Sequence, residues 1–192
     1  RTNEQASGIM HFAYMTWFRQ CYDYRHIQPY PTYYAMQRAM QPVLVSAELW
    51  GRNLYAGEKL HTRIYVVNDN EEGRDLKPMS LIWSIVDETD KVLASGTEQF
   101  PAVEYYGRKY IEPNIHMPSN LPADKVNAKL KLTLTENGVT LSKNEYGLLL
   151  ARKEWNIGQV AENKKILLLD KDNMKATLDF LNIACQTVPS IK

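Results

Sequence analysis

The stretch NAKLKLTLTENGVTLSKNEYGLLLA, residues 127–151, decides the fold. Its first half alternates apolar with polar side chains, and the apolar set is Ala128, Leu130, Leu132 and Leu134. A period of two is that of a strand with one buried face. The pair Asn137-Gly138 follows, and both residues tolerate the positive φ angles of a two-residue hairpin turn. The stretch therefore predicts two long antiparallel strands.

Other segments repeat this alternation on the N-terminal side of the hairpin. KLHTRIYVVND places Leu60, Thr62, Ile64 and Val66 on one face, and SLIWSIV places Leu81, Trp83 and Ile85 on one face. VLVSAELW, KVLASGTEQF and KYIEPNIHM bring the total to about seven strands, which predicts a mainly β fold, an immunoglobulin-like antiparallel β-sandwich. Trp83 stands where such a sandwich often buries a tryptophan between its sheets. No cysteine pair brackets Trp83, so an antibody-type domain is excluded.

The two ends of the chain have other periodicities. Residues 9–12 are expected to form a buried strand, and a helix is expected from Pro31, with an apolar stripe of Tyr33, Met36 and Met40. Residues 163–192 read as a β-α-β unit. Its helix would be capped by Asp172 or Asn173 and would bury Met174, Thr177, Leu178 and Leu181. Because one such unit is normally a piece of a larger sheet, we expect the chain to be a fragment of a longer protein.

Composition excludes several classes of function. The 192 residues are 44% hydrophobic and 23% charged, and 23 Lys plus Arg stand against 22 Asp plus Glu. A formal charge of +1 predicts neither a nucleic-acid partner nor an anionic membrane surface. No apolar run approaches the ~20 residues of a membrane span. Cys21 and Cys185 make no disulfide framework.

Motifs for cofactors, metals and catalysis are missing from the sequence. The four histidines lack the spacing of metal ligands, and neither a glycine-rich phosphate loop nor a nucleophile elbow occurs. Residues 68–75 (NDNEEGRD) resemble a calcium loop but have Met79 where a bidentate glutamate is needed, so a hairpin loop is expected. Cys21 lies near Asp23 and His26 in sequence, but a structural thiol is the better interpretation. We therefore expect no cofactor, no metal and no catalytic residue.

Aromatic residues are the one enriched class of candidate binding residues. They concentrate near the N-terminus, at Tyr14, Trp17, Phe18, Tyr22, Tyr24, Tyr30, Tyr33 and Tyr34. Such rings can line a carbohydrate cleft or pack one domain onto the next, and packing is the expectation for most of them. Tyr105 and Tyr106 form a second small cluster, which we expect to pack within a loop.

Three segments together resemble glycoside hydrolase family 2, in particular its β-galactosidase-like bacterial members. They are SGIMHFAYMTWF (7–18), IQPYPTYYAMQRAMQPVLVSAEL (27–49) and WGRNLYAGEKLHTRIYVVND (50–69). The resemblance extends over about residues 7–155. It implies that residues 1–42 end a (β/α)₈ catalytic barrel, that 43–156 form the immunoglobulin-like sandwich, and that 157–192 begin a further α/β accessory domain.

The resemblance also implies a function. The catalytic glutamates of the family would lie upstream of Arg1, so this chain would be inactive alone, while the intact enzyme would be retaining. Trp17 matches a position beside the sugar subsite, and Tyr14 lies near it in sequence. The implied partners are carbohydrate, through the parent's barrel, and that barrel itself, and the implied location is periplasmic or secreted.

Two alternatives of other classes stay open. A sandwich could hold sugar on exposed aromatic rings without any chemistry, and a coplanar pair of exposed Tyr or Trp on one face would favour that function. It could instead be a structural interaction module, for which a large exposed apolar patch would be the sign.

Overall fold

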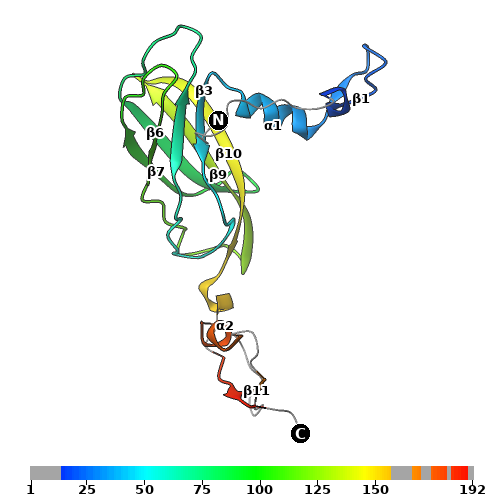
Figure 1. The fold of residues 1–192 in the computed structure, drawn as a ribbon, viewed down its shortest axis with the longest axis vertical. Coiled ribbons are helices and arrows are strands. Elements are labelled where there is room, and N and C mark those ends of the chain that lie inside the picture. The colour runs from blue at the N-terminus through cyan, green and yellow to red at the C-terminus, as the bar shows by residue number, and fades with distance from the viewer. Residues whose placement is uncertain (1–13, 157–165, 170–173, 181–182, 190–192) are drawn as a thin grey trace.

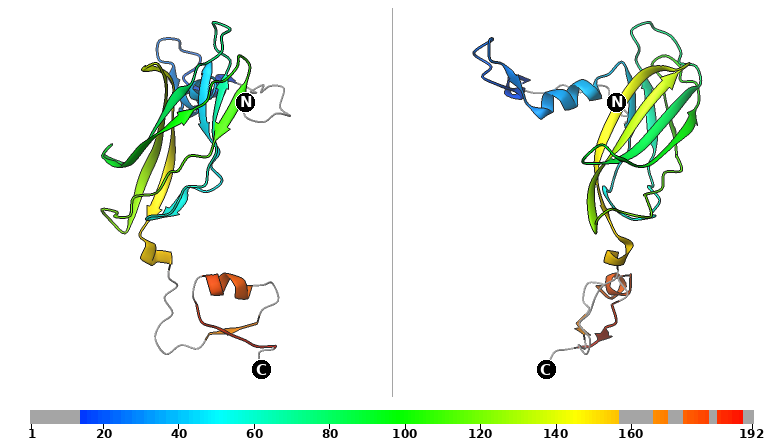
Figure 2. Two further views of the ribbon diagram at one scale, coloured as in Figure 1. Left: turned by 90° about the vertical axis from the view of Figure 1, so that its left-hand side faces the viewer. Right: turned by 180° about the vertical axis from the view of Figure 1, so that it is seen from behind.

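A computed structural model describes residues 14–156, 166–169, 174–180 and 183–189. The predicted mainly β fold is confirmed: two sheets face each other in a sandwich (Figure 1, Figure 2). A helical segment precedes the sandwich and a β-α-β unit follows it. Within this described part, no helix has the length and apolar character needed to cross a membrane.

The larger sheet has five strands in the order β4-β10-β9-β6-β7. Their bounds are β4 (Asn53–Tyr55), β6 (Met79–Asp87), β7 (Val92–Phe100), β9 (Lys125–Glu136) and β10 (Val139–Ala151). The hairpin predicted from Asn137-Gly138 is confirmed, since β9 pairs antiparallel with β10 and the two turn residues have φ angles of 48° and 80°. β4 departs from the antiparallel expectation because it pairs parallel with β10. Its direction is not set by a hairpin, because the chain reaches β4 from a strand of the other sheet.

The smaller sheet has the order β3-β5-β8 and is antiparallel. Its strands are β3 (Val43–Ala47), β5 (Ile64–Asn68) and β8 (Arg108–Ile111). The outer edge of β3 lies beside β10 of the other sheet (Figure 1), and side chains of β10 bind the β3 backbone. Ser142 Oγ accepts from Val45 N at 3.0 Å, and the Tyr146 hydroxyl accepts from Ala47 N at 2.9 Å. An edge that would otherwise be open is thereby closed.

The core lies between the two sheets and follows the predicted alternation. The apolar residues predicted to face inward are all buried: Leu60, Ile64, Val66, Leu81, Trp83, Ile85, Ala128, Leu130, Leu132 and Leu134. The side chain of Trp83 is 7% exposed, so its predicted place between the sheets is confirmed. Gly96 pairs with Trp83 across β6 and β7, and a Cβ there would lie 2.6 Å from Cζ2 of the indole. The absence of a side chain at Gly96 therefore makes room for the indole.

The N-terminal segment forms an arm that extends from one side of the sandwich (Figure 1). Its elements are η1 (Tyr14–Trp17), β1 (Phe18–Arg19), β2 (Gln28–Pro29) and α1 (Pro31–Ala39). The helix predicted from Pro31 is confirmed, with the proline in its first turn. No residue of α1 is fully buried: within the predicted apolar stripe, Tyr33 and Met36 are half-buried, and Met40, just after the helix, is exposed. The strand predicted over residues 9–12 lies outside the described residues.

The C-terminal segment is the predicted β-α-β unit. After η2 (Lys153–Asn156), β11 (Leu167–Leu168) and β12 (Gln186–Thr187) pair in parallel around α2 (Met174–Phe180). The apolar stripe predicted for α2 is not buried, because two strands of two residues offer too little surface to cover a helix face. The predicted cap at Asp172 or Asn173 and the stripe residue Leu181 lie outside the described residues. The division into domains at residues 42 and 156 stays a prediction.

Candidate functional site

Trp17, the predicted carbohydrate-proximal residue, lies in the outer part of the arm, beside the end of α1 that is far from the sandwich. Its side chain is half-buried, and its backbone carbonyl accepts a hydrogen bond of 2.7 Å from Tyr30 N, just before α1. Phe18 stacks on Tyr33 with ring centroids 5.2 Å apart. These contacts tie η1 and β1 to α1. The side chain of Tyr14 is outside the described part of the chain, and the sugar contact of Trp17 and Tyr14 stays a prediction.

The far end of the arm is a turn with exposed aromatic side chains. The side chain of Tyr22 is 98% exposed, and Tyr24 carries the guanidinium of Arg25 over its ring at 5.4 Å. His26 Nδ1 lies 2.6 Å from the Asp23 carboxylate, three residues earlier, and both side chains are mostly exposed. The Cys21 thiol is free and half-buried. The turn therefore presents aromatic surface and a local His–Asp pair.

Residues 68–75 form a loop held by amide side chains, and the calcium-like pattern has a structural explanation. Asn68 is fully buried, and its Nδ2 donates to the carbonyls of Arg74, Val103 and Glu104 at 2.9–3.2 Å. Asn70 Nδ2 donates to Asn68 Oδ1 at 2.6 Å. The amide side chains therefore bind carbonyls of this loop and of the neighbouring residues 103–104. In the part of the chain that the structure describes, no group of three or more His, Cys, Asp or Glu could hold a metal ion.

A pocket of about 400 Å³ lies at the end of the smaller sheet. Three separate segments line it: Glu48 and Trp50 after β3, residues 59–63 before β5, and Glu112 with Pro113 after β8. The indole of Trp50 is 91% exposed. Its Nε1 donates to Glu48 Oε1 at 3.2 Å, so the ring is tied to the carboxylate that lines the pocket. The pocket therefore combines an open aromatic face with charged groups.

Neighbouring side chains hold the charged groups of the pocket in place. The Tyr65 hydroxyl donates to Glu48 Oε2 at 3.4 Å, and Thr62 Oγ1 donates to the Glu48 carbonyl at 3.0 Å. Arg63 Nε donates to Glu112 Oε1 at 3.2 Å, and its guanidinium lies 4.9 Å from the centroid of the Tyr110 ring. Hydrogen bonding to Tyr65, and then to Glu112, raises the pKa of Arg63 above its ordinary value, so Arg63 stays a cation.

Sequence reasoning missed this pocket because its residues come from three segments that only the fold brings together. The sign that could have been used is Trp50, a large apolar residue in a polar stretch after a strand. The coplanar aromatic pair that would favour a flat sugar platform is not found among the described rings. Tyr65 and Tyr110 are inclined by 46°, and Tyr105 and Tyr106 by 47°. The Tyr105–Tyr106 ring contact itself is as expected from their place in one loop.

Comparison with known proteins gives similarity to part of the fold. No family model and no curated protein sequence matches the chain. Among solved structures, a β-glucuronidase from glycoside hydrolase family 2 matches with a TM-score of 0.41 and 14% identity over 56% of this chain. The exo-chitosanase CsxA of Amycolatopsis orientalis matches with a TM-score of 0.46 and 16% identity over 62%. A predicted β-galactosidase from Bacteroides fragilis matches with a TM-score of 0.40 and 10% identity over 57%.

These three neighbours are carbohydrate-active enzymes of much greater length. The chain covers 11% of the glucuronidase, 12% of the chitosanase and 16% of the predicted β-galactosidase. The similarity is distant and partial, and it concerns the fold.

Proposed function

We propose that this chain is a non-catalytic accessory part of a retaining family 2 glycoside hydrolase, β-galactosidase-like, whose sandwich braces the catalytic barrel. The observation that carries the proposal is the arm. Its helix α1 carries Tyr33, Tyr34 and Met36, and none of these side chains is fully buried. Tyr22, Tyr24 and Tyr34 are all exposed. Aromatic side chains gain most when they are buried against a partner, so the arm has the surface of a domain joint.

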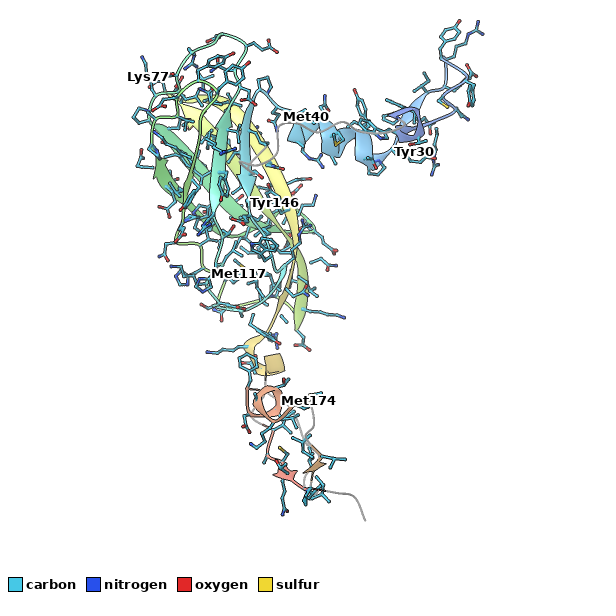
Figure 3. All side chains as sticks on the ribbon, viewed as in Figure 1. Tyr30, Met40, Lys77, Met117, Tyr146 and Met174 are labelled. Carbon is cyan, nitrogen blue, oxygen red and sulfur yellow. The ribbon has the colours of Figure 1, made fainter. Side chains whose placement is uncertain are left out.

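The connection between arm and sandwich supports a bracing role. Gln41 follows α1 directly, and its Nε2 donates to the carbonyl of Arg38 at 2.7 Å and to that of Lys143 in β10 at 3.0 Å. Its Oε1 accepts from Ser142 Oγ at 3.2 Å and from Lys143 N at 3.3 Å. Figure 3 shows Met40 at the end of α1 next to the sandwich and Tyr30 at the far end. One side chain thus joins the helix to the longest strand.

The sequence resemblance supplies the identity of the proposed partner. The order of a barrel-like segment, a P-x-Y-Y-A helix and a Q-P-V-L-V-S strand is that of the family, and the same order would place the catalytic glutamates in the preceding barrel. The sugar contact of Trp17, the barrel as intramolecular partner and the periplasmic or secreted location belong to the same proposal.

Hydrogen exchange tests the bracing role. Amide exchange is measured in the 192-residue chain and in the longer protein that carries the preceding barrel, with the β9–β10 amides as internal reference. We expect the α1 amides to exchange rapidly in the short chain and to become protected in the longer one, because the barrel would cover the helix. Equal exchange of α1 in both proteins would refute the bracing role. Hydrolysis of nitrophenyl glycosides by the short chain would refute the non-catalytic assignment.

A further inference from the structure

The pocket beside Trp50 belongs to the sandwich itself and shares no lining residue with the Gln41 joint. It lies at the end of the smaller sheet, and the Gln41 joint is made with β10 of the larger one. Its volume of about 400 Å³ is in the range of small-molecule sites, roughly 300–1,000 Å³. A pocket of this size accommodates one or two sugar rings.

The charges of the pocket cancel. Glu48 and Glu112 carry one negative charge each, and Lys59 and Arg63 one positive charge each, so the sum is zero with His61 neutral. The wall therefore offers both carboxylate acceptors and cationic donors and has no net charge. Such a wall suits an uncharged ligand with many hydroxyl groups, because each hydroxyl can donate to a carboxylate and accept from a cation. A phosphate or a polyanion would meet two carboxylates as well as two cations, so its charge would gain no net attraction.

The aromatic element of the pocket is an exposed indole. With 91% of its surface in solvent, Trp50 has an apolar face that none of the described residues covers. A pyranose ring has an apolar side of C–H groups that can lie flat on such a face, while its hydroxyls point sideways. The hydrogen bond from Trp50 Nε1 to Glu48 then orients the indole beside the carboxylate, so stacking and hydrogen bonding can act on one ligand.

The polar groups are held before any ligand arrives. Glu48 receives hydrogen bonds from Trp50 and Tyr65, and Arg63 is fixed between Glu112 and the ring of Tyr110. Groups that are already in position lose little conformational freedom on binding. We propose that this pocket binds a neutral pyranose sugar, which stacks on Trp50 and hydrogen-bonds to Glu48, Arg63 and Glu112.

Nuclear magnetic resonance titration of the ¹⁵N-labelled 192-residue chain tests the proposal. The probes are methyl β-D-galactopyranoside and methyl β-D-glucopyranoside, with D-glucuronate as the charged comparison. We expect saturable shifts of the Trp50 indole N–H and the Arg63 Nε–H with at least one neutral glycoside, at a Kd in the millimolar range. No saturable shift with either neutral glycoside, or tighter binding of glucuronate, would overturn the proposal.

Two matched variants separate stacking from nonspecific effects. Trp50→Ala should raise the Kd about tenfold or more, since exposed aromatic anchors carry much of the affinity of such sites. Tyr106→Ala removes another highly exposed ring, outside the pocket, and should leave the Kd unchanged. Trp50→Phe keeps a ring and should retain part of the affinity. Unchanged binding in Trp50→Ala would overturn the proposal even if the glycoside binds elsewhere on the chain.

Discussion

The contact between Trp83 and Gly96 links one backbone position to the packing of the core. Alanine at Gly96 would place a Cβ within 3.0 Å of three atoms of the indole, so the ring or the strand must shift. We expect Gly96→Ala to lower the free energy of unfolding by about 1–3 kcal/mol, the usual cost of overpacking. Urea unfolding, monitored by circular dichroism, measures this loss of stability.

Gly147→Ala is the matched control for this prediction. Gly147 also lies within a strand, but a Cβ there would have no neighbour within 4 Å. The free energy of unfolding of the Gly147→Ala variant should be unchanged or slightly higher, because alanine restricts the unfolded chain. If both variants lose the same stability, the indole is not the cause.

Glu136 makes the stability of the folded protein depend on pH, and the sign of this dependence can be predicted. Arg74 binds both carboxylate oxygens of Glu136, at 3.1 and 2.9 Å, and Lys77 N donates to Oε1 at 2.7 Å. The hydrogen bonds from Arg74 are the main reason that the pKa of Glu136 is lowered from its ordinary value. Because the folded state holds the ionised form, the stabilisation is complete above the ordinary pKa of an unfolded glutamate. It is lost as the pH falls through the lower pKa of the folded state.

Comparing Glu136→Gln with the unchanged protein from pH 7 down to pH 3 tests this sign. At pH 7 the variant should lose about 1–3 kcal/mol, as expected for hydrogen bonds to a charged group. The difference should shrink as the pH falls. Glu145→Gln is the control, because the Glu145 ion pair with Lys129 is 3.8 Å long and exposed, and should contribute little at any pH. A pH-independent difference for Glu136→Gln would contradict the prediction.

At the scale of elements, the smaller sheet depends on side chains of β10 to complete the edge of β3. Ser142 and Tyr146 accept from two backbone N–H groups of β3, and Asn144 Nδ2 donates to the Val45 carbonyl at 2.9 Å. Val45 is fully buried, so its N–H cannot turn to water instead. Ser142→Ala and Tyr146→Phe should therefore each cost about 1–3 kcal/mol in the free energy of unfolding, the price of a buried unpaired donor.

Thermal and urea unfolding of the two variants measure this cost. Ser95→Ala, in the exposed middle of β7, is the matched control and should change stability by less than about 0.5 kcal/mol, as surface substitutions usually do. Equal stability of Ser142→Ala and Ser95→Ala would show that β10 does not hold the edge of β3.

At the scale of the whole molecule, Gln41 is expected to set the direction of the arm. Gln41→Ala removes its side-chain hydrogen bonds to Arg38, Ser142 and Lys143, so α1 should move more freely relative to the sandwich. Spin labels at Gln37 and Ser95, in a background with both cysteines replaced by serine, report the distance distribution by electron–electron double resonance. The distance distribution should broaden in Gln41→Ala. It should stay unchanged in the control variant Gln99→Ala. An unchanged width in Gln41→Ala would contradict the prediction.

Local signals determined the parts of the molecule that need no distant partner. The alternation in residues 127–151 and the Asn137-Gly138 turn specify the long hairpin, because strand period and turn geometry are set within a few residues. The inward faces of β5, β6 and β9, the helix from Pro31 and the C-terminal β-α-β unit also follow from short-range pattern.

Tertiary structure alone decided the rest. Whether an apolar stripe is buried depends on what covers it, which is why no residue of α1 or α2 is fully buried although both helices were predicted. The parallel pairing of β4, the closing of β3 by Ser142 and Tyr146, and the pocket around Trp50 each join segments far apart in the chain. Sequence periodicity identifies the face a residue occupies but not the segment that lies opposite, and the pocket exists only where three such segments meet.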